Sequence, residues 1–260
     1  MAYIQHLSGF ISLIIICGSV LYLCSKARHG VKYEIRRVAG IDVIDEAIGR
    51  ATEMGRPVHL TTGLAKLYEA TAPQTLAGLS ILSYVARKCA RNGTPLITTI
   101  NVAEIIPLVA EIYKNASIIE NIPDWFKENE NNIRYLSSHR FSYATGVQGV
   151  LQRERPGASF LFGRFMAEAL IFAESGNIAG AMQVAGTAST TQTPFFVAAC
   201  DYALLGDELY AAGAYLSEDP IQIASIAAQD IGKYWAIILL ILGGILSAVG
   251  IPWIVTFLKM

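Results

Sequence analysis

The stretch P-V-H-L-T-T-G, residues 57–63, has the form of a short buried strand that ends in polar residues. Its first four residues make a mainly apolar run, and two threonines and a glycine close that run. A long stretch with helical periodicity follows, from about Pro73 to Asn92. A strand followed by a helix is the unit from which parallel sheets are built.

The same unit recurs along the chain. Further strands are predicted by four apolar runs, at Pro95–Thr98, Ile133–Leu136, Ala158–Phe162 and Ala181–Ala185. An amphipathic helix is predicted before the first strand, at Ile41–Met54, and Asn101 with Glu104 has the form of a capping box that opens a helix running to Asn115. This alternation predicts an α/β fold with a mainly parallel, doubly wound (Rossmann-like) sheet.

Two segments are less regular. Phe195–Cys200 could be a sixth strand or the opening of a helix that continues to Tyr215, and the alanine-rich stretch Asp201–Leu216 favours the helix. Ser117–Asn132 is predicted to be a surface excursion whose Trp125 and Phe126 dock on a neighbouring protein or on lipid.

Two apolar runs lie outside this domain, and neither contains Lys, Arg, Asp or Glu. Crossing about 30 Å of hydrocarbon takes roughly 20 helical residues, so both runs are predicted to be transmembrane helices. The predicted segments are a first span at 7–24, a basic juxtamembrane linker at 25–40, the α/β domain at 41–232 and a second span at 234–258.

Charge predicts the orientation of these spans. Only His6 precedes the first span, whereas five basic residues follow it: Lys26, Arg28, Lys32, Arg36 and Arg37. Basic residues close to a crossing stay on the cytoplasmic side. The α/β domain is therefore predicted to be cytoplasmic, with both termini outside. The arrangement is also the reverse of a cleaved signal peptide.

Composition fits a membrane protein with one domain and excludes several functions. Of the 260 residues, 53% are hydrophobic and 16% are charged. The net charge of −1 gives no support for a nucleic-acid partner. The sequence lacks GxGxxG, GxxxxGK followed by Ser or Thr, GxSxG and HExxH, and its four cysteines have neither a disulfide nor a zinc pattern. No cofactor and no metal is therefore predicted.

Candidate binding residues lie just after the predicted strands, because ligands of open parallel sheets bind at the carboxyl ends of the strands. The set is Thr62, Asn101, His139, Arg164, Gly186, Thr187, Ser189, Thr190 and Thr191. Hydroxyls, free backbone N–H groups and an arginine suit a small anionic ligand that carries a phosphate or carboxylate. The alternative is that these residues only cap helices and that the nearby arginines pair with Glu168 or Glu174. His139 could act as a general base beside Ser137 or Ser138, or cap a helix.

Three stretches carry a resemblance to a known family: RATEMGRPV (Arg50–Val58), GVQGVLQRERPGASFLFGRFMAEALIFAESGN (Gly146–Asn177) and QVAGTASTTQTPFFVAACDYALLGDELYAAGAYLS (Gln183–Ser217). Through them the chain resembles an uncharacterised family of membrane-anchored bacterial and archaeal proteins that carries a domain of unknown function. The resemblance covers about Val38–Gly232. It implies a location in the cytoplasmic membrane and assigns no activity and no site residue.

Two functions remain open. The favoured one is a non-catalytic scaffold or accessory subunit that forms homo-oligomers in the lipid bilayer. It would associate through small residues spaced by four in the second span (Gly243 with Ser247, Gly244 with Ala248) and through an Ala- and Gly-rich surface at Ala211–Ala214. The alternative is a domain that binds, or an enzyme that acts on, a small anionic ligand at the strand ends.

Overall fold

The computed structural model describes residues 7–29, 31 and 39–248. The chain divides into two compact units, one made of residues 1–36 with 218–260 and the other of residues 37–217. The second unit is the α/β domain. It ends at Ser217, whereas the sequence analysis placed the boundary at Gly232, because a continuous helix begins at Pro220.

Among the described residues, the sheet of the α/β domain has six strands, all parallel, in the order β3-β2-β1-β4-β5-β6. Their bounds are β1 Val58–Gly63, β2 Leu96–Ile100, β3 Ile133–Tyr135, β4 Ala158–Arg164, β5 Met182–Thr187 and β6 Tyr202–Leu205. The strand order reverses between β1 and β4. This doubly wound arrangement confirms the predicted α/β class, and the reversal is the switch point at which such folds bind ligands.

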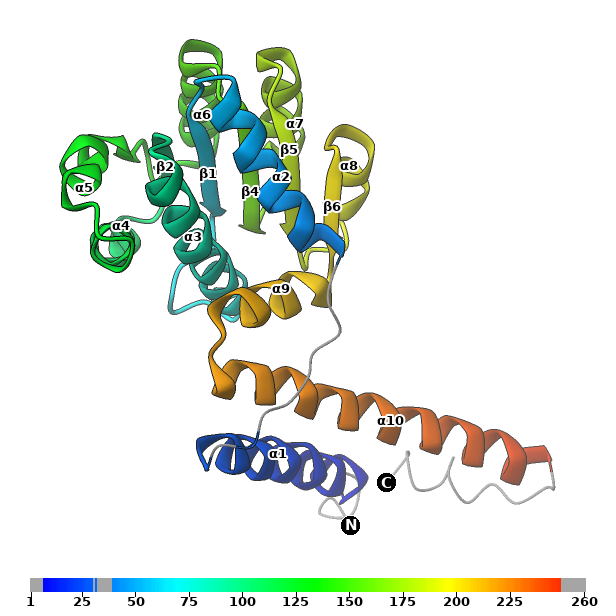
Figure 1. Ribbon diagram of the computed structural model, residues 1–260. Helices are drawn as coiled ribbons and strands as arrows, with labels where there is room; N and C mark the ends of the chain where they lie inside the picture. The colour runs from blue at the N-terminus through cyan, green and yellow to red at the C-terminus, as the bar shows by residue number, and fades with distance from the viewer. Residues whose placement is uncertain (1–6, 30, 32–38, 249–260) are drawn as a thin grey trace. The chain divides into compact units, whose positions relative to one another are not determined.

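Helices cover both faces of the sheet (Figure 1). The first face, here called the α3 face, carries α2 Ala39–Glu53, α3 Ala72–Asn92, α4 Ile106–Ile119, α5 Pro123–Asn129 and α9 Asp207–Ser217. The second, the α6 face, carries α6 Arg140–Glu154, α7 Glu168–Ala179 and α8 Thr193–Ala199. Short 3₁₀ turns lie at Ala103–Ile105 and Glu130–Asn132.

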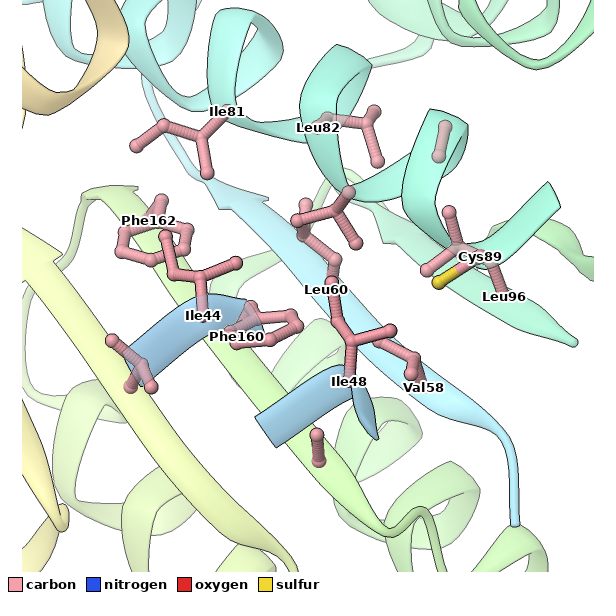
Figure 2. Close-up of a cluster of buried hydrophobic side chains, with 14 of the residues drawn as sticks. Ile44, Ile48, Val58, Leu60, Ile81, Leu82, Cys89, Leu96, Phe160 and Phe162 are labelled. Atoms are coloured by element: carbon pink, nitrogen blue, oxygen red, sulfur yellow. The ribbon is translucent and has the colours of Figure 1, made fainter. Parts of the chain in front are cut away.

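The α3 face buries a dry apolar core. Figure 2 shows Ile44 and Ile48 of α2 against Leu60 of β1 and Phe160 of β4. These four side chains are at most 1% exposed, and each buried aliphatic or aromatic side chain contributes roughly 1.5–3 kcal/mol. This core fixes α2 and α3 on the central strands.

Two predictions of helices in the domain were wrong. The alanine-rich stretch 201–216 is not one helix, because α8 ends at Ala199 and residues 202–205 form the edge strand β6 before α9 begins. Asn101 does not cap α4. Pro107 stands in the first turn of that helix, where a missing N–H costs nothing, so the helix begins at Ile106.

Within two segments that were predicted to contact partners, particular residues are buried in the domain. Trp125 is 2% exposed, stacks near Tyr113 and donates a hydrogen bond from Nε1 to the Thr94 carbonyl oxygen (3.1 Å). In α9, Ala212, Gly213 and Ala214 are buried, with Gly213 close to Ala77 of α3. Trp125 and residues 212–214 are therefore not available to a partner in this conformation, whereas most of residues 117–132 lie at the surface.

The other unit contains α1, Leu7–Arg28, and α10, Pro220–Ala248. The two helices lie side by side, and a Cβ on Gly232 would sit 3.8 Å from Ile16. Within the described part of the chain, one segment, Pro220–Ile245, is long and apolar enough to cross a membrane. It begins earlier than the predicted span at 234–258, whose last ten residues lie outside the described residues. The first span and the orientation stay predictions.

Candidate functional site

At the switch point, the backbones of β1 and β4 are in close contact and fill the space between the two strand ends. Gly63 and Gly163 have φ of +77° and +136°, and side chains there would overlap Arg164 and Thr62 of the opposite strand. Pairing continues past the strand ends, since the Leu64 N–H donates to the Arg164 carbonyl oxygen (2.9 Å). Glycine allows this close approach of two backbones.

At this edge of the sheet, an ion pair joins β4 to the loop that follows β1. Arg164 Nη1 lies 2.9 Å from Glu69 Oε2, and both side chains are about one-third exposed (31% and 32%). The Thr71 hydroxyl donates to the same carboxylate oxygen (3.4 Å). Thr62, next to Gly63 in β1, is 1% exposed, and its buried hydroxyl oxygen has no hydrogen-bond partner among the described residues.

The end of β5 joins the same region through Gln74 in the first turn of α3. Gln74 Oε1 accepts hydrogen bonds from the Ala188 N–H (3.2 Å) and the Thr187 hydroxyl (3.4 Å). Buried Gly186 lies between Phe162 and Leu209. The last three residues of the predicted set lie in the outer part of the loop after β5: Ser189 is half-buried, and Thr190 and Thr191 are exposed.

The other predicted residues lie at the ends of β2 and β3. The Asn101 amide donates to the Ser137 carbonyl oxygen (2.6 Å), tying these two strand ends together. His139 is exposed at the start of α6, with no side-chain cap bond. Glu154, the last residue of the same helix, pairs with Arg134 (2.7 Å). Arg164 and Thr187 are thus linked to α3 and the loop before it, whereas, among the described residues, the side chains of Thr62, Asn101 and His139 make no hydrogen bond to that group.

Beneath α6 lies a buried polar belt, which we define as His59, Thr61, Thr99, Tyr143 and Ser159. The His59 ring bridges β1 to both neighbouring strands, with its nitrogens 3.0 Å from the hydroxyls of Ser159 and Thr99. Burial, with a smaller effect of the Arg134 charge, lowers the pKa of His59 to about 3. The ring is therefore neutral at pH 7, and a hydroxyl faces each of its nitrogens, which satisfies either tautomer.

Tyr143 extends the belt to α6. Its hydroxyl lies 2.6 Å from Thr61 Oγ1 and donates to the Thr99 carbonyl oxygen (3.0 Å). Burial raises the pKa of Tyr143 to about 12, so the phenol stays protonated. The sequence analysis missed this belt, because a single histidine and scattered threonines look like ordinary strand residues.

Replacing Tyr143 by Phe is expected to lower the free energy of unfolding by about 1–3 kcal/mol, because the buried Thr61 hydroxyl and Thr99 carbonyl lose their partner. Tyr135→Phe is the control, since Tyr135 is 45% exposed. Urea unfolding of the full-length protein measures both changes. Equal stability of the two variants would contradict a structural role for the belt.

Glu168 begins α7 and is fully buried. Its Oε1 accepts the Met166 N–H (2.7 Å), its Oε2 has no hydrogen-bond partner, and Arg140 Nε lies 3.9 Å from it. A carboxylate in the first turn of a helix also stabilises the positive end of the helix dipole. The sequence analysis left Glu168 or Glu174 as a partner for Arg140 and Arg164. Arg140 reaches Glu168 only as a long contact, whereas Arg164 pairs with Glu69.

Other groups that could react are inaccessible or dispersed. Burial raises the pKa of the Cys89 thiol, and burial with the Asp201 charge raises that of Cys200 to about 12, so neither is a thiolate near pH 7. In the part of the chain that the structure describes, no three His, Cys, Asp or Glu side chains gather as metal ligands. The sequence analysis also missed Glu69 and Gln74, because neither stands directly after a strand.

Comparison with known proteins gives a family and no closer relative. A family model described as a domain of unknown function (DUF6754) matches residues 1–258. No curated protein and no solved structure matches the chain.

Proposed function

The chain belongs to the DUF6754 family, and from that premise we propose that it is a membrane-anchored, non-catalytic scaffold or accessory subunit. Its α/β domain would lie in the cytoplasm of a bacterium or archaeon, between two membrane spans with both termini outside. The protein would form homo-oligomers through its membrane helices and its domain. Support for the anchor comes from the apolar helix Pro220–Ile245 and from the charge pattern around the first apolar run.

One observation carries the non-catalytic part of this proposal. The edge where a doubly wound domain holds its ligand is filled by the chain's own groups, through the crossing at Gly63 and Gly163 and the Arg164–Glu69 ion pair. The histidine and tyrosine nearest to it in the core, His59 and Tyr143, are hydrogen-bonded inside the belt. Both side chains therefore serve packing, which supports a non-catalytic role.

The mass of the full-length protein in mild detergent tests the scaffold. We expect a large symmetric oligomer by light scattering and single-particle imaging. In α10, a Cβ on Gly244 would meet nothing within 4 Å, so Gly244→Leu leaves the single chain intact and should reduce the mass if copies meet there. Leu242→Ile, at an exposed position of the same helix, should leave the mass unchanged. A monomeric unmodified protein would exclude the scaffold.

A second function, the binding of a small anionic ligand at the strand ends, is favoured by Thr62. A buried hydroxyl without a partner costs roughly 1–3 kcal/mol, and such groups concentrate where a ligand or a water supplies the missing bond. The region around Thr62 also holds the cation Arg164 and the start of α3.

A further inference from the structure

We propose that Asp230 and Lys233 of α10 form ion pairs between neighbouring copies of this chain inside the membrane. This inference rests on the homo-oligomer proposed above and adds the surface through which its membrane helices associate. That surface, here called the polar stripe, consists of Gln222, Gln229, Asp230 and Lys233, whose side chains are all exposed in the single chain.

The helices α1 and α10 are antiparallel, and two contacts fix their register. A Cβ on Gly232 of α10 would lie 3.8 Å from Ile16 of α1, and Cys24 Sγ lies 4.0 Å from the Ile221 carbonyl oxygen. Ile16 stands at the middle of the predicted first span, 7–24. An α1 that crosses the bilayer therefore places Gly232 near the middle of the bilayer.

This register moves the second span toward the start of α10. Two antiparallel spans that begin and end at the same depth, 7–24 and 234–258, would place Tyr234 beside Cys24, whereas the structure places Ile221 there. The segment that is long and apolar enough to cross a membrane, Pro220–Ile245, agrees with the observed register. It contains two charged residues, Asp230 and Lys233, which the predicted span left out.

Both charges then lie deep in the hydrocarbon. Asp230 and Lys233 stand two residues before and one residue after Gly232, and so within about 3 Å of it along the helix axis. The middle of the bilayer is about 15 Å from either surface, too far for the Lys233 side chain to reach water. Lys233 Nζ lies 3.5 Å from Asp230 Oδ1, yet the two side chains stay 55% and 58% exposed. Lipid does not solvate charges, so a polar neighbour has to cover them.

A second copy of this chain fits as that neighbour. Ala224, Ala228 and Gly232 recur every four residues on the side of α10 that is buried or half-buried. Because each helical residue turns the chain by about 100°, the polar stripe lies on the other side of α10, away from α1. Each copy presents one negative and one positive side chain there, so the surface is complementary to itself. Asp230 of one copy can pair with Lys233 of the next.

Reversal of either charge tests this pairing. Asp230→Lys leaves two positive side chains on the polar stripe, and Lys233→Asp leaves two negative ones. Each full-length variant alone, in mild detergent, should fall to the mass of a single chain by light scattering, because like charges would meet. Co-expressed with different tags, the two variants should copurify and regain the mass of the unmodified protein. A pair within one helix cannot explain such a rescue, since neither variant contains one.

The α/β domain supplies a matched control. Asp124 and Lys127 of α5 form an ion pair at the same spacing (3.4 Å), with side chains 76% and 75% exposed. Asp124→Lys and Lys127→Asp should leave the mass unchanged. Replacing both Asp230 and Lys233 by Leu covers the case in which a charge reversal prevents membrane insertion. Lipid can surround the two leucines, so this double variant should insert and be monomeric.

Each outcome decides a separate claim. Monomeric charge-reversed variants that reassemble when co-expressed support the pairing. An unchanged mass in either charge reversal overturns the pairing and leaves the scaffold, and so do monomeric variants that stay apart on co-expression. If the charge-reversed variants do not insert, the double leucine variant decides: a monomer supports the pairing, and an oligomer of unchanged mass overturns it. A monomeric unmodified protein overturns the pairing together with the scaffold.

Discussion

Acidification from pH 6.5 to pH 3 is expected to destabilise the α/β domain by roughly 5 kcal/mol through His59 alone, since each unit of pKa shift is worth about 1.4 kcal/mol. In the native state the ring stays neutral down to pH 3, whereas in the unfolded chain it takes up a proton near pH 6.5. The unfolded state therefore binds more protons over this interval, and stability falls as the pH falls.

His59→Gln removes the titrating group and keeps a polar side chain. Urea unfolding of the full-length protein in mild detergent, followed by near-UV circular dichroism, should show a shallower loss of stability with acid in the variant. Carboxylates that titrate in both proteins cancel in the comparison. The same slope in both proteins would mean that His59 is protonated in the native state.

Gly163→Ala is expected to cost roughly 4 kcal/mol or more, which is a large share of the roughly 5–15 kcal/mol by which a domain of ordinary stability is folded. A Cβ at this position would overlap the Thr62 carbonyl oxygen, and φ is +136°, a conformation that L side chains rarely adopt. Soluble yield and thermal unfolding of the full-length protein measure the effect.

Substitutions at two other glycines distinguish the steric overlap from the backbone strain. Gly180 has φ of +72° with nothing within 4 Å of a Cβ, so Gly180→Ala isolates backbone strain and should cost about 1 kcal/mol. Gly149 lies inside α6 with open space and no positive φ, so Gly149→Ala should stabilise the domain by about 0.5–1 kcal/mol. If Gly163→Ala behaved like Gly180→Ala, β1 and β4 could not be in such close contact.

Most of the fold could be predicted from the sequence because strands and helices alternate, each with a clear hydrophobic periodicity, and turn residues separate them. β1 to β5 each lie where an apolar run ends in polar residues, and α3 ends at Gly93 in the left-handed conformation typical of a helix C-cap. β6 escaped prediction because its four residues stand between alanine-rich segments, and only the partner strand β5 makes them extended.

The site was predicted less well, because sequence order identifies strand ends but not the side chains that converge on them. Thr62, Arg164 and Thr187 were predicted to lie at strand ends, and the structure places them within the last two residues of β1, β4 and β5. Glu69 and Gln74 were missed, since they reach the same region from a loop and from the first turn of α3. Asn101 was correctly placed at a strand end, but its amide bonds a neighbouring loop and not a helix.

The two faces of the sheet differ in a way that bears on how reliably the strands align. If β4 slid by two residues against β1, every side chain would keep its face, and an apolar surface such as the α3 face would tolerate the shift. The belt would not, because His59 would lose the Ser159 hydroxyl opposite it. Each buried group stranded in this way costs roughly 1–3 kcal/mol. The polar residues under α6 thus disfavour sheets in which β1 and β4 pair in the wrong register.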